Sequence, residues 1–205
     1  MKRLKMAVLF ILSIATAQFA NATVIFHSDL SEFQATTNSS ITESFATVGS
    51  FGSGTVSFQS NGNTYTNLGG INGGNLVVGN YFSGLGGDSK ILTGNGAENF
   101  KVTFGSPSTA IGFDVFVAAA QDLTIELSGV SGILDTFTFD ITSAFTGFYG
   151  FTSSEAITQL TYTASNGHVD NTGIDNIRQG TNISEPSALA LLGLGLAGLG
   201  FIRRR

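Results

Sequence analysis

The chain has 205 residues, 42% of them hydrophobic, and it contains neither cysteine nor tryptophan. The absence of cysteine excludes disulfides, thiolate metal sites and cysteine nucleophiles. All fourteen acidic residues lie between Asp29 and Glu185, where the only basic residues are Lys90, Lys101 and Arg178, so this part of the chain has a net charge of −11. Such a charge argues against binding to nucleic acid or to an anionic membrane surface.

The first 22 residues have the three parts of a secretory signal peptide. An apolar run covers residues 6–17, and the basic residues before it are Lys2, Arg3 and Lys5. Ala20 and Ala22 form a small-x-small cleavage site. An uncleaved anchor is the alternative, but the run is short for a membrane helix. We therefore expect cleavage after Ala22 and export of the domain that follows.

That domain begins with a short strand at residues 24–26 and a short helix at 29–35. Asp29 is suited to cap the helix, because Glu32 follows it by three residues as in a capping box. Leu30 and Phe33 form an apolar pair with i, i+3 spacing on one face. The helix is predicted to cover one end of the domain.

Alternation of apolar and polar residues predicts strands in nearly all of the remaining domain. Phe100, Val102 and Phe104 show the pattern clearly, and turn residues separate such segments at fairly regular intervals. The other predicted strands are 41–45, 55–59, 64–68, 110–117, 123–127, 137–141, 147–151, 157–162 and 173–177. The pattern indicates an all-β fold, an antiparallel sandwich with one short helix, built as a single domain over residues 23–180.

Residues 69–87 are the part of this domain that the pattern leaves open. The stretch is rich in glycine and asparagine and has Leu76, Val77 and Val78 in its middle. It is either an irregular loop or a hairpin with wide turns.

Residues that could catalyse a reaction are scarce, so the chain is not expected to be an enzyme. His27 and His168 are the only histidines, they are not spaced as a metal-ligand pair, and surface roles are expected for both. A pair of carboxylates would suffice for glycoside hydrolysis, and Asp114, Glu126 and Asp140 are candidates. The lack of tryptophan disfavours a sugar-processing cleft; the available tyrosines are Tyr65, Tyr81, Tyr149 and Tyr162.

The last 25 residues, 181–205, have the organisation of a membrane-directed signal. Ser184, Glu185 and Pro186 begin a short motif at 184–187, and an apolar, glycine-rich segment follows at 187–202. The chain then closes on Arg203, Arg204 and Arg205, which resist transfer across a bilayer. As a helix the apolar segment would span about 24 Å, somewhat short of the roughly 30 Å hydrocarbon core.

This tail resembles the PEP-CTERM sorting signal of Gram-negative and related bacteria, which consists of a Pro-Glu-Pro motif, a transmembrane segment and a basic end. Ser184 stands where the first proline usually is. The resemblance implies recognition by an exosortase, processing near Glu185 and Pro186, and delivery from the inner membrane to the cell surface or extracellular matrix, commonly in species that produce exopolysaccharide. An ordinary tail anchor is the alternative.

The domain between the two signals resembles the jelly-roll, lectin-like domains that often precede this sorting signal. The segments that carry the resemblance are 24–26 with the following helix, 43–45, 110–114, 148–151 and 173–177. The resemblance implies a structural calcium ion held by Glu43 and Asp175, and Asp170, Asn171 and Asn176 could add oxygen ligands. The alternative is that Asp175 and Asn176 make the hydrogen bonds that terminate a strand.

These observations lead to two hypotheses on function. In the first, the chain is an exported, noncatalytic surface or matrix protein that is sorted by an exosortase, passes transiently through the inner membrane and associates with exopolysaccharide or biofilm. In the second, it is a calcium-dependent, lectin-like carbohydrate-binding module. A glycoside hydrolase ranks below both, and no cofactor other than calcium is expected.

Overall fold

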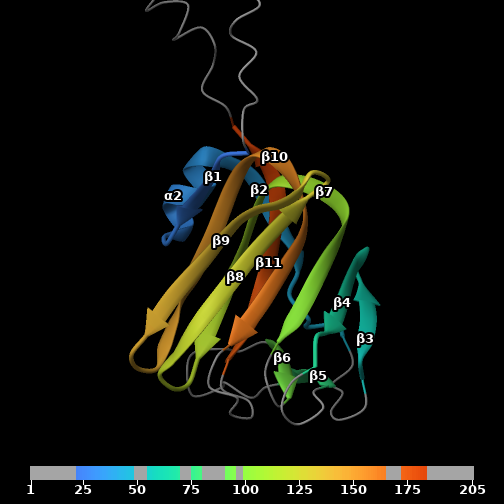
Figure 1. Cartoon of the computed structure of the whole chain (residues 1–205). Coiled ribbons are helices and arrows are strands. Elements are labelled where there is room, and N and C mark those ends of the chain that lie inside the picture. Colours follow the sequence, from blue (N-terminus) through green and yellow to red (C-terminus); the bar gives the residue numbers. More distant parts are fainter. Residues whose placement is uncertain are drawn as a thin grey trace, which may run out of the picture.

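Two long strands, β7 (Phe100–Val117) and β10 (Phe145–Ala164), form the centre of the fold (Figure 1). The computed structural model describes residues 22–48, 55–69, 75–79, 91–95, 99–164 and 172–183. The other elements are β1 (Val24–His27), α2 (Leu30–Thr36), β2 (Thr37–Glu43), β3 (Ser57–Ser60), β4 (Asn63–Asn67), β5 (Asn75–Gly79), β6 (Ile91–Asn95), β8 (Gln121–Gly129), β9 (Gly132–Ile141) and β11 (Thr172–Asn182).

β7 and β10 pair with each other twice. Residues 145–152 of β10 lie opposite 110–117 of β7, and residues 159–162 lie opposite 100–103. Between these two stretches the register shifts, and β7 carries Gly105 and Pro107 there. Register shifts of this kind bend strands. Each strand therefore takes part in two differently oriented portions of sheet.

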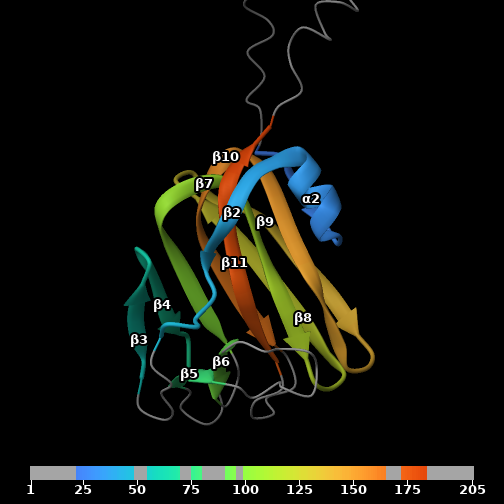
Figure 2. The same cartoon turned by 180° about the vertical axis from the view of Figure 1, so that it is seen from behind.

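The two portions form the layers of an antiparallel sandwich. The front layer in Figure 1 contains β9, β8, the second half of β10, the first half of β7, β4 and β3. The back layer contains β1, the first half of β10, the second half of β7 and β11, which pairs along its other edge with β6 and β2. Figure 2, from behind, shows β2 and β11 nearest the viewer.

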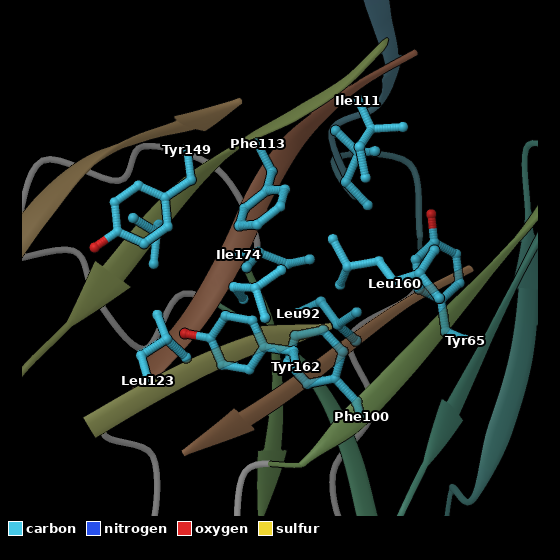
Figure 3. Packing of buried hydrophobic residues seen from close by; sticks show 14 of the residues in the cluster. Tyr65, Leu92, Phe100, Ile111, Phe113, Leu123, Tyr149, Leu160, Tyr162 and Ile174 are labelled. Atoms are coloured by element: carbon cyan, nitrogen blue, oxygen red, sulfur yellow. The ribbon is translucent and has the colours of Figure 1, made fainter. Parts of the chain in front are cut away.

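The core lies between the layers and is filled by the alternate residues of each strand. Phe100 and Tyr162 of the front layer stack at a centroid distance of 4.6 Å, and Phe113 and Ile174 face them from the back layer (Figure 3). Burial of these large side chains is the main contribution to stability. Because successive side chains of a strand point to opposite faces, every second residue of both layers points into this core.

Helix α2 covers the outer face of the back layer, not an end of the sandwich. The Asp29 carboxylate caps it by accepting hydrogen bonds from the backbone N–H groups of Ser31 and Glu32, at 2.8 and 3.0 Å. Phe33 is buried there against Ala110 and Phe148. Close approach of these rings requires two glycines that lie opposite each other, Gly112 on β7 and Gly150 on β10.

The predicted all-β antiparallel sandwich with one short helix is confirmed for the described residues. Two predictions within it were wrong: the segments 100–104 and 110–117 are one strand, and so are 147–151 and 157–162. Phe45, predicted to end a strand, has φ 51° and lies beyond β2. Leu76 to Val78 belong to β5, which pairs with β6, so this part of the open stretch is a strand.

Both ends of the domain lie at the same end of the sandwich. Val24, at the start of β1, is opposite Ser153. The backbone N–H of Asn182, which is the last residue of β11, donates a hydrogen bond to Thr109 Oγ1. Ser153 and Thr109 belong to the bend of the two long strands. The turn from β9 to β10 lies at the opposite end, because Phe145 is level with Val117 and the start of β11 (Figure 1).

We expect Gly112→Ala to lower the free energy of unfolding by about 1–3 kcal/mol, because an added Cβ would lie 2.6 Å from Cζ of Phe148. Urea denaturation measures the change. Combining it with Phe148→Leu, which removes the contacting ring atoms, should cost less than the sum of the two single changes. Simple additivity would contradict this packing.

Candidate functional site

Most residues of the predicted sorting and cleavage sites lie outside the described residues. These are Ala20, Ser184, Glu185, Pro186, Arg203, Arg204 and Arg205, whereas Ala22 is the first residue described. The same holds for His168 and for Asp170 and Asn171 of the calcium prediction. No helix in the described ranges is long and apolar enough to cross a membrane. The predicted signal peptide and membrane segment stay predictions.

The two carboxylates of the predicted calcium site are both buried. Glu43 ends β2 and is 2% exposed; its Oε1 accepts from the Phe45 backbone N–H at 2.7 Å and its Oε2 from Asn61 Nδ2 at 3.1 Å. Asp175, on β11, is 0% exposed, and its Oδ1 accepts from the Asn176 backbone N–H at 2.7 Å. The hydrogen bond of the alternative interpretation is thus present, but it does not end the strand: β11 continues to Asn182, and the bond lies where the register between β11 and β7 shifts.

A cation at Glu43 would have to compete with these hydrogen bonds. Asn61 could turn its amide and offer the carbonyl oxygen, which is a suitable calcium ligand. Within the described ranges, however, no three histidine, aspartate or glutamate side chains gather as a metal site would require. Calcium binding by Glu43 and Asp175 therefore stays a prediction.

The three carboxylates considered for hydrolysis do not share one site. Asp114 lies on the back layer, where its Oδ1 accepts from Arg178 Nη1 at 2.9 Å and its Oδ2 from Asn176 Nδ2 at 2.7 Å. Glu126 and Asp140 belong to β8 and β9 of the front layer. Both oxygens of the Asp114 carboxylate are therefore engaged within the back layer, by Arg178 and Asn176.

The expected surface role for His27 was wrong, because its side chain is 4% exposed beneath α2. Its Nε2 shares a hydrogen bond with the Thr152 hydroxyl at 3.1 Å, and its Nδ1 lies 3.5 Å from Glu32 Oε1. The cause is the helix itself: Phe33 packs its ring edge against the imidazole. His27 thus belongs to the packing between α2 and the back layer.

The first hollow on the described surface lies at the turn from β9 to β10 and has a volume of about 490 Å³. Its apolar lining consists of Phe139, Phe145 and Tyr149, with Ile141 and Ala144 beside them. Its polar lining consists of Thr138, Asp140, Thr142 and Ser143. We call this the β9–β10 pocket. It combines aromatic side chains with hydroxyls and one carboxylate.

Another hollow, of about 390 Å³, lies beside the bend of β7 and is lined by polar side chains together with glycines and Pro107. At its centre the Gln179 amide oxygen accepts from Thr42 Oγ1 and Asn63 Nδ2, both at 3.0 Å, and its nitrogen donates to the Ser106 carbonyl at 3.2 Å. We call this the Gln179 groove. Asn61, the partner of Glu43, also lines it, so the predicted calcium ligand borders this groove.

Sequence reasoning named Tyr149 but missed Phe139, Phe145 and Gln179. Phe139 belongs to the predicted strand 137–141; it packs on Tyr149 and also lines the pocket. The available signal was the short segment 142–144 between two aromatic strands. No sequence pattern marks Gln179, because its partners come from β2, β4 and β7.

Burial raises the pKa of Tyr149 to about 12 from 10.0. Between pH 10 and about 12, the unfolded chain therefore loses this proton while the folded chain keeps it, and stability falls as pH rises. We expect Tyr149→Phe to abolish this part of the loss, which is about 1.4 kcal/mol per pH unit. Urea denaturation at several pH values measures it. Parallel stability curves for the two proteins would contradict the assignment.

Comparison with known proteins gives little on the domain itself. No curated protein matches the sequence. A mutant of a family 29 carbohydrate binding module is 13% identical, with 73% of this chain and 99% of that chain covered and a TM-score of 0.44. The enzymatically active domain of tailspike protein 4 of bacteriophage CBA120 is 16% identical, with 61% and 21% covered and a TM-score of 0.38. Similarity of this degree does not establish a common ligand.

The C-terminus gives a definite result. The family model described as the PEP-CTERM protein-sorting motif matches residues 182–205. The match begins at Asn182, the last residue of β11, and continues to the final arginine. It covers the apolar segment and the basic end that the sequence pattern singled out. The chain therefore carries a PEP-CTERM protein-sorting motif at its C-terminus.

Proposed function

We propose that this chain is an exported, noncatalytic protein of the cell surface or extracellular matrix that an exosortase-type enzyme sorts and that associates with exopolysaccharide. The observation that carries the proposal is the sorting motif at residues 182–205. It begins where β11 ends, so the sandwich is the part of the molecule that sorting delivers.

The arrangement of the sandwich is consistent with this role. β1 begins and β11 ends at the same end, so a membrane-anchored precursor would hold that end toward the bilayer. The β9–β10 pocket lies at the opposite end and would face outward. A surface that faces outward from the cell is available to extracellular polymers.

The electrostatics of the domain favour partners without strong negative charge. Residues 29–185 carry −11, so highly anionic polymers are repelled at low ionic strength. Of the carboxylates considered for hydrolysis, Asp114 lies in the back layer and is paired with Arg178, whereas Glu126 and Asp140 lie in the front layer at separate register positions, opposite Thr136 and Asp122. This supports association rather than catalysis.

A second candidate is a calcium-dependent lectin that uses the Gln179 groove. One observation favours it: Asn61 both lines the groove and donates to Glu43. A calcium ion on Glu43 would reorient Asn61 and so alter the groove. Calcium dependence of binding distinguishes this candidate from the first.

Replacing Glu185 by alanine, or deleting Arg203, Arg204 and Arg205, should retain the protein in the inner membrane, because each change removes a part of the signal. Fractionation and immunoblotting of a strain with the sorting enzyme measures the distribution. Lys101→Ala, which removes a basic residue outside the signal, should leave delivery unchanged. Normal delivery of both tail variants would refute sorting by this motif.

A screen of the full chain, in detergent, against immobilised oligosaccharides tests the two candidates in millimolar calcium and in chelator. The first candidate predicts equal binding in both conditions. The second predicts binding that chelator abolishes and that Glu43→Gln weakens at least tenfold. Failure to bind any saccharide in either condition would refute both.

A further inference from the structure

We infer that the β9–β10 pocket binds one pyranose unit of a polysaccharide that carries no negative charge there. The inference rests on the proposed function, because it names the site through which the domain would associate with exopolysaccharide. Its basis is the combination of three aromatic rings with free polar groups in one hollow. A volume of about 490 Å³ lies within the roughly 300–1,000 Å³ typical of small-ligand sites.

The aromatic surface of the pocket is fixed by packing. Tyr149 stacks on Phe139 with ring centroids 4.3 Å apart and an interplanar angle of 27°, and the Phe145 centroid lies 5.9 Å from that of Tyr149 at an interplanar angle of 33°. The rings of Phe26 and Tyr149 also pack in an edge-to-face arrangement, with their centroids 5.3 Å apart. Figure 3 shows Tyr149 at the margin of the core with its hydroxyl directed away from Phe113. Because Tyr149 is only 6% exposed, it supports the half-buried rings of Phe139 and Phe145, and these two rings offer the aromatic surface to the C–H face of a sugar.

Phe145 can adopt this position in the pocket because the residue two further along β10, on the same face of the strand, is Gly147. A Cβ on Gly147 would lie 2.5 Å from Cζ of Phe145, so the ring lies across the backbone at that position. The side chain of Phe145 is only half-buried, and it lines the pocket. Gly147 is therefore a determinant of the shape of the pocket.

The polar side of the pocket has groups available for sugar hydroxyls. The side chains of Asp140, Thr142 and Ser143 are exposed, and no hydrogen bond within the described ranges holds them. Hydroxyls can both donate and accept, and a carboxylate accepts from two donors. Aromatic surface on one side and such groups on the other match a ring whose faces are C–H and whose edge is hydroxyl.

Charge decides between sugar classes. Asp140 lies directly opposite Asp122 in the register of β8 and β9, so two carboxylates belong to this end of the sandwich. A uronic acid or sulfated unit in the pocket would meet like charge at close range. An uncharged hexose or an amino sugar does not meet this repulsion.

The test uses the full chain in detergent and isothermal titration with neutral, amino-sugar and uronic-acid oligosaccharides. We expect binding of a neutral or amino-sugar oligomer, and at least tenfold weaker binding by Phe145→Leu, Asp140→Asn and Gly147→Ala. Phe58→Leu and Glu126→Gln are the matched controls, because they change a half-buried ring and a front-layer carboxylate outside the pocket. Both controls should bind as the unmodified chain does.

The outcomes separate the inference from the proposed function. Binding by the unmodified chain that the pocket variants leave unchanged, with unchanged melting temperatures, overturns the pocket and leaves the function standing. Preference for uronic-acid oligomers overturns the assigned sugar class. Failure of the unmodified chain to bind any saccharide overturns the pocket and the function together. If Phe145→Leu or Gly147→Ala fails to melt cooperatively, Asp140→Asn, which changes an exposed side chain, decides the test, and unchanged binding by it overturns the pocket.

Discussion

The pairing of β7 with β10 is the constraint on which the remaining structure depends. Because both strands bend where their register shifts, one pair of strands supplies the centre of both layers. Every other strand of the two layers joins this pair directly or through one or two neighbours. The core between the layers, the helix on the back layer and both hollows are all positioned by this single pairing. A change at the bend would therefore alter several distant features at once.

Sequence periodicity predicted which residues face the core, but not how the strands continue. Alternation identified Phe100, Val102 and Phe104 correctly, since a half-buried strand requires it. It predicted a separate strand at 110–117, although the two segments are one strand that carries Gly105 and Pro107, residues that are usually rare inside strands. In this chain they lie at a bend, and the strand resumes at Ala110 in the other layer. Local composition does not distinguish a bend from a turn.

The candidate sites also differ in whether they could be predicted from the sequence. The sorting signal was predicted from sequence because its information is local: a short motif, an apolar run and a basic end stand next to one another. The β9–β10 pocket was not predicted, because stacking of Tyr149 on Phe139 depends on how β9 approaches β10 at the margin of the sandwich. His27 was misassigned for the same reason, since α2 folds back over it. Contacts between elements cannot be read from periodicity.

The position of the two ends of the domain bears on how the precursor folds. With the predicted signal peptide before β1 and the predicted membrane segment after β11, the precursor would be attached to one bilayer at two points. Since β1 begins and β11 ends beside the same bend, the sandwich can close while both attachments remain. The domain could then fold on the membrane before either attachment is cut. The processing enzyme would therefore act next to a folded domain and not on an unfolded chain.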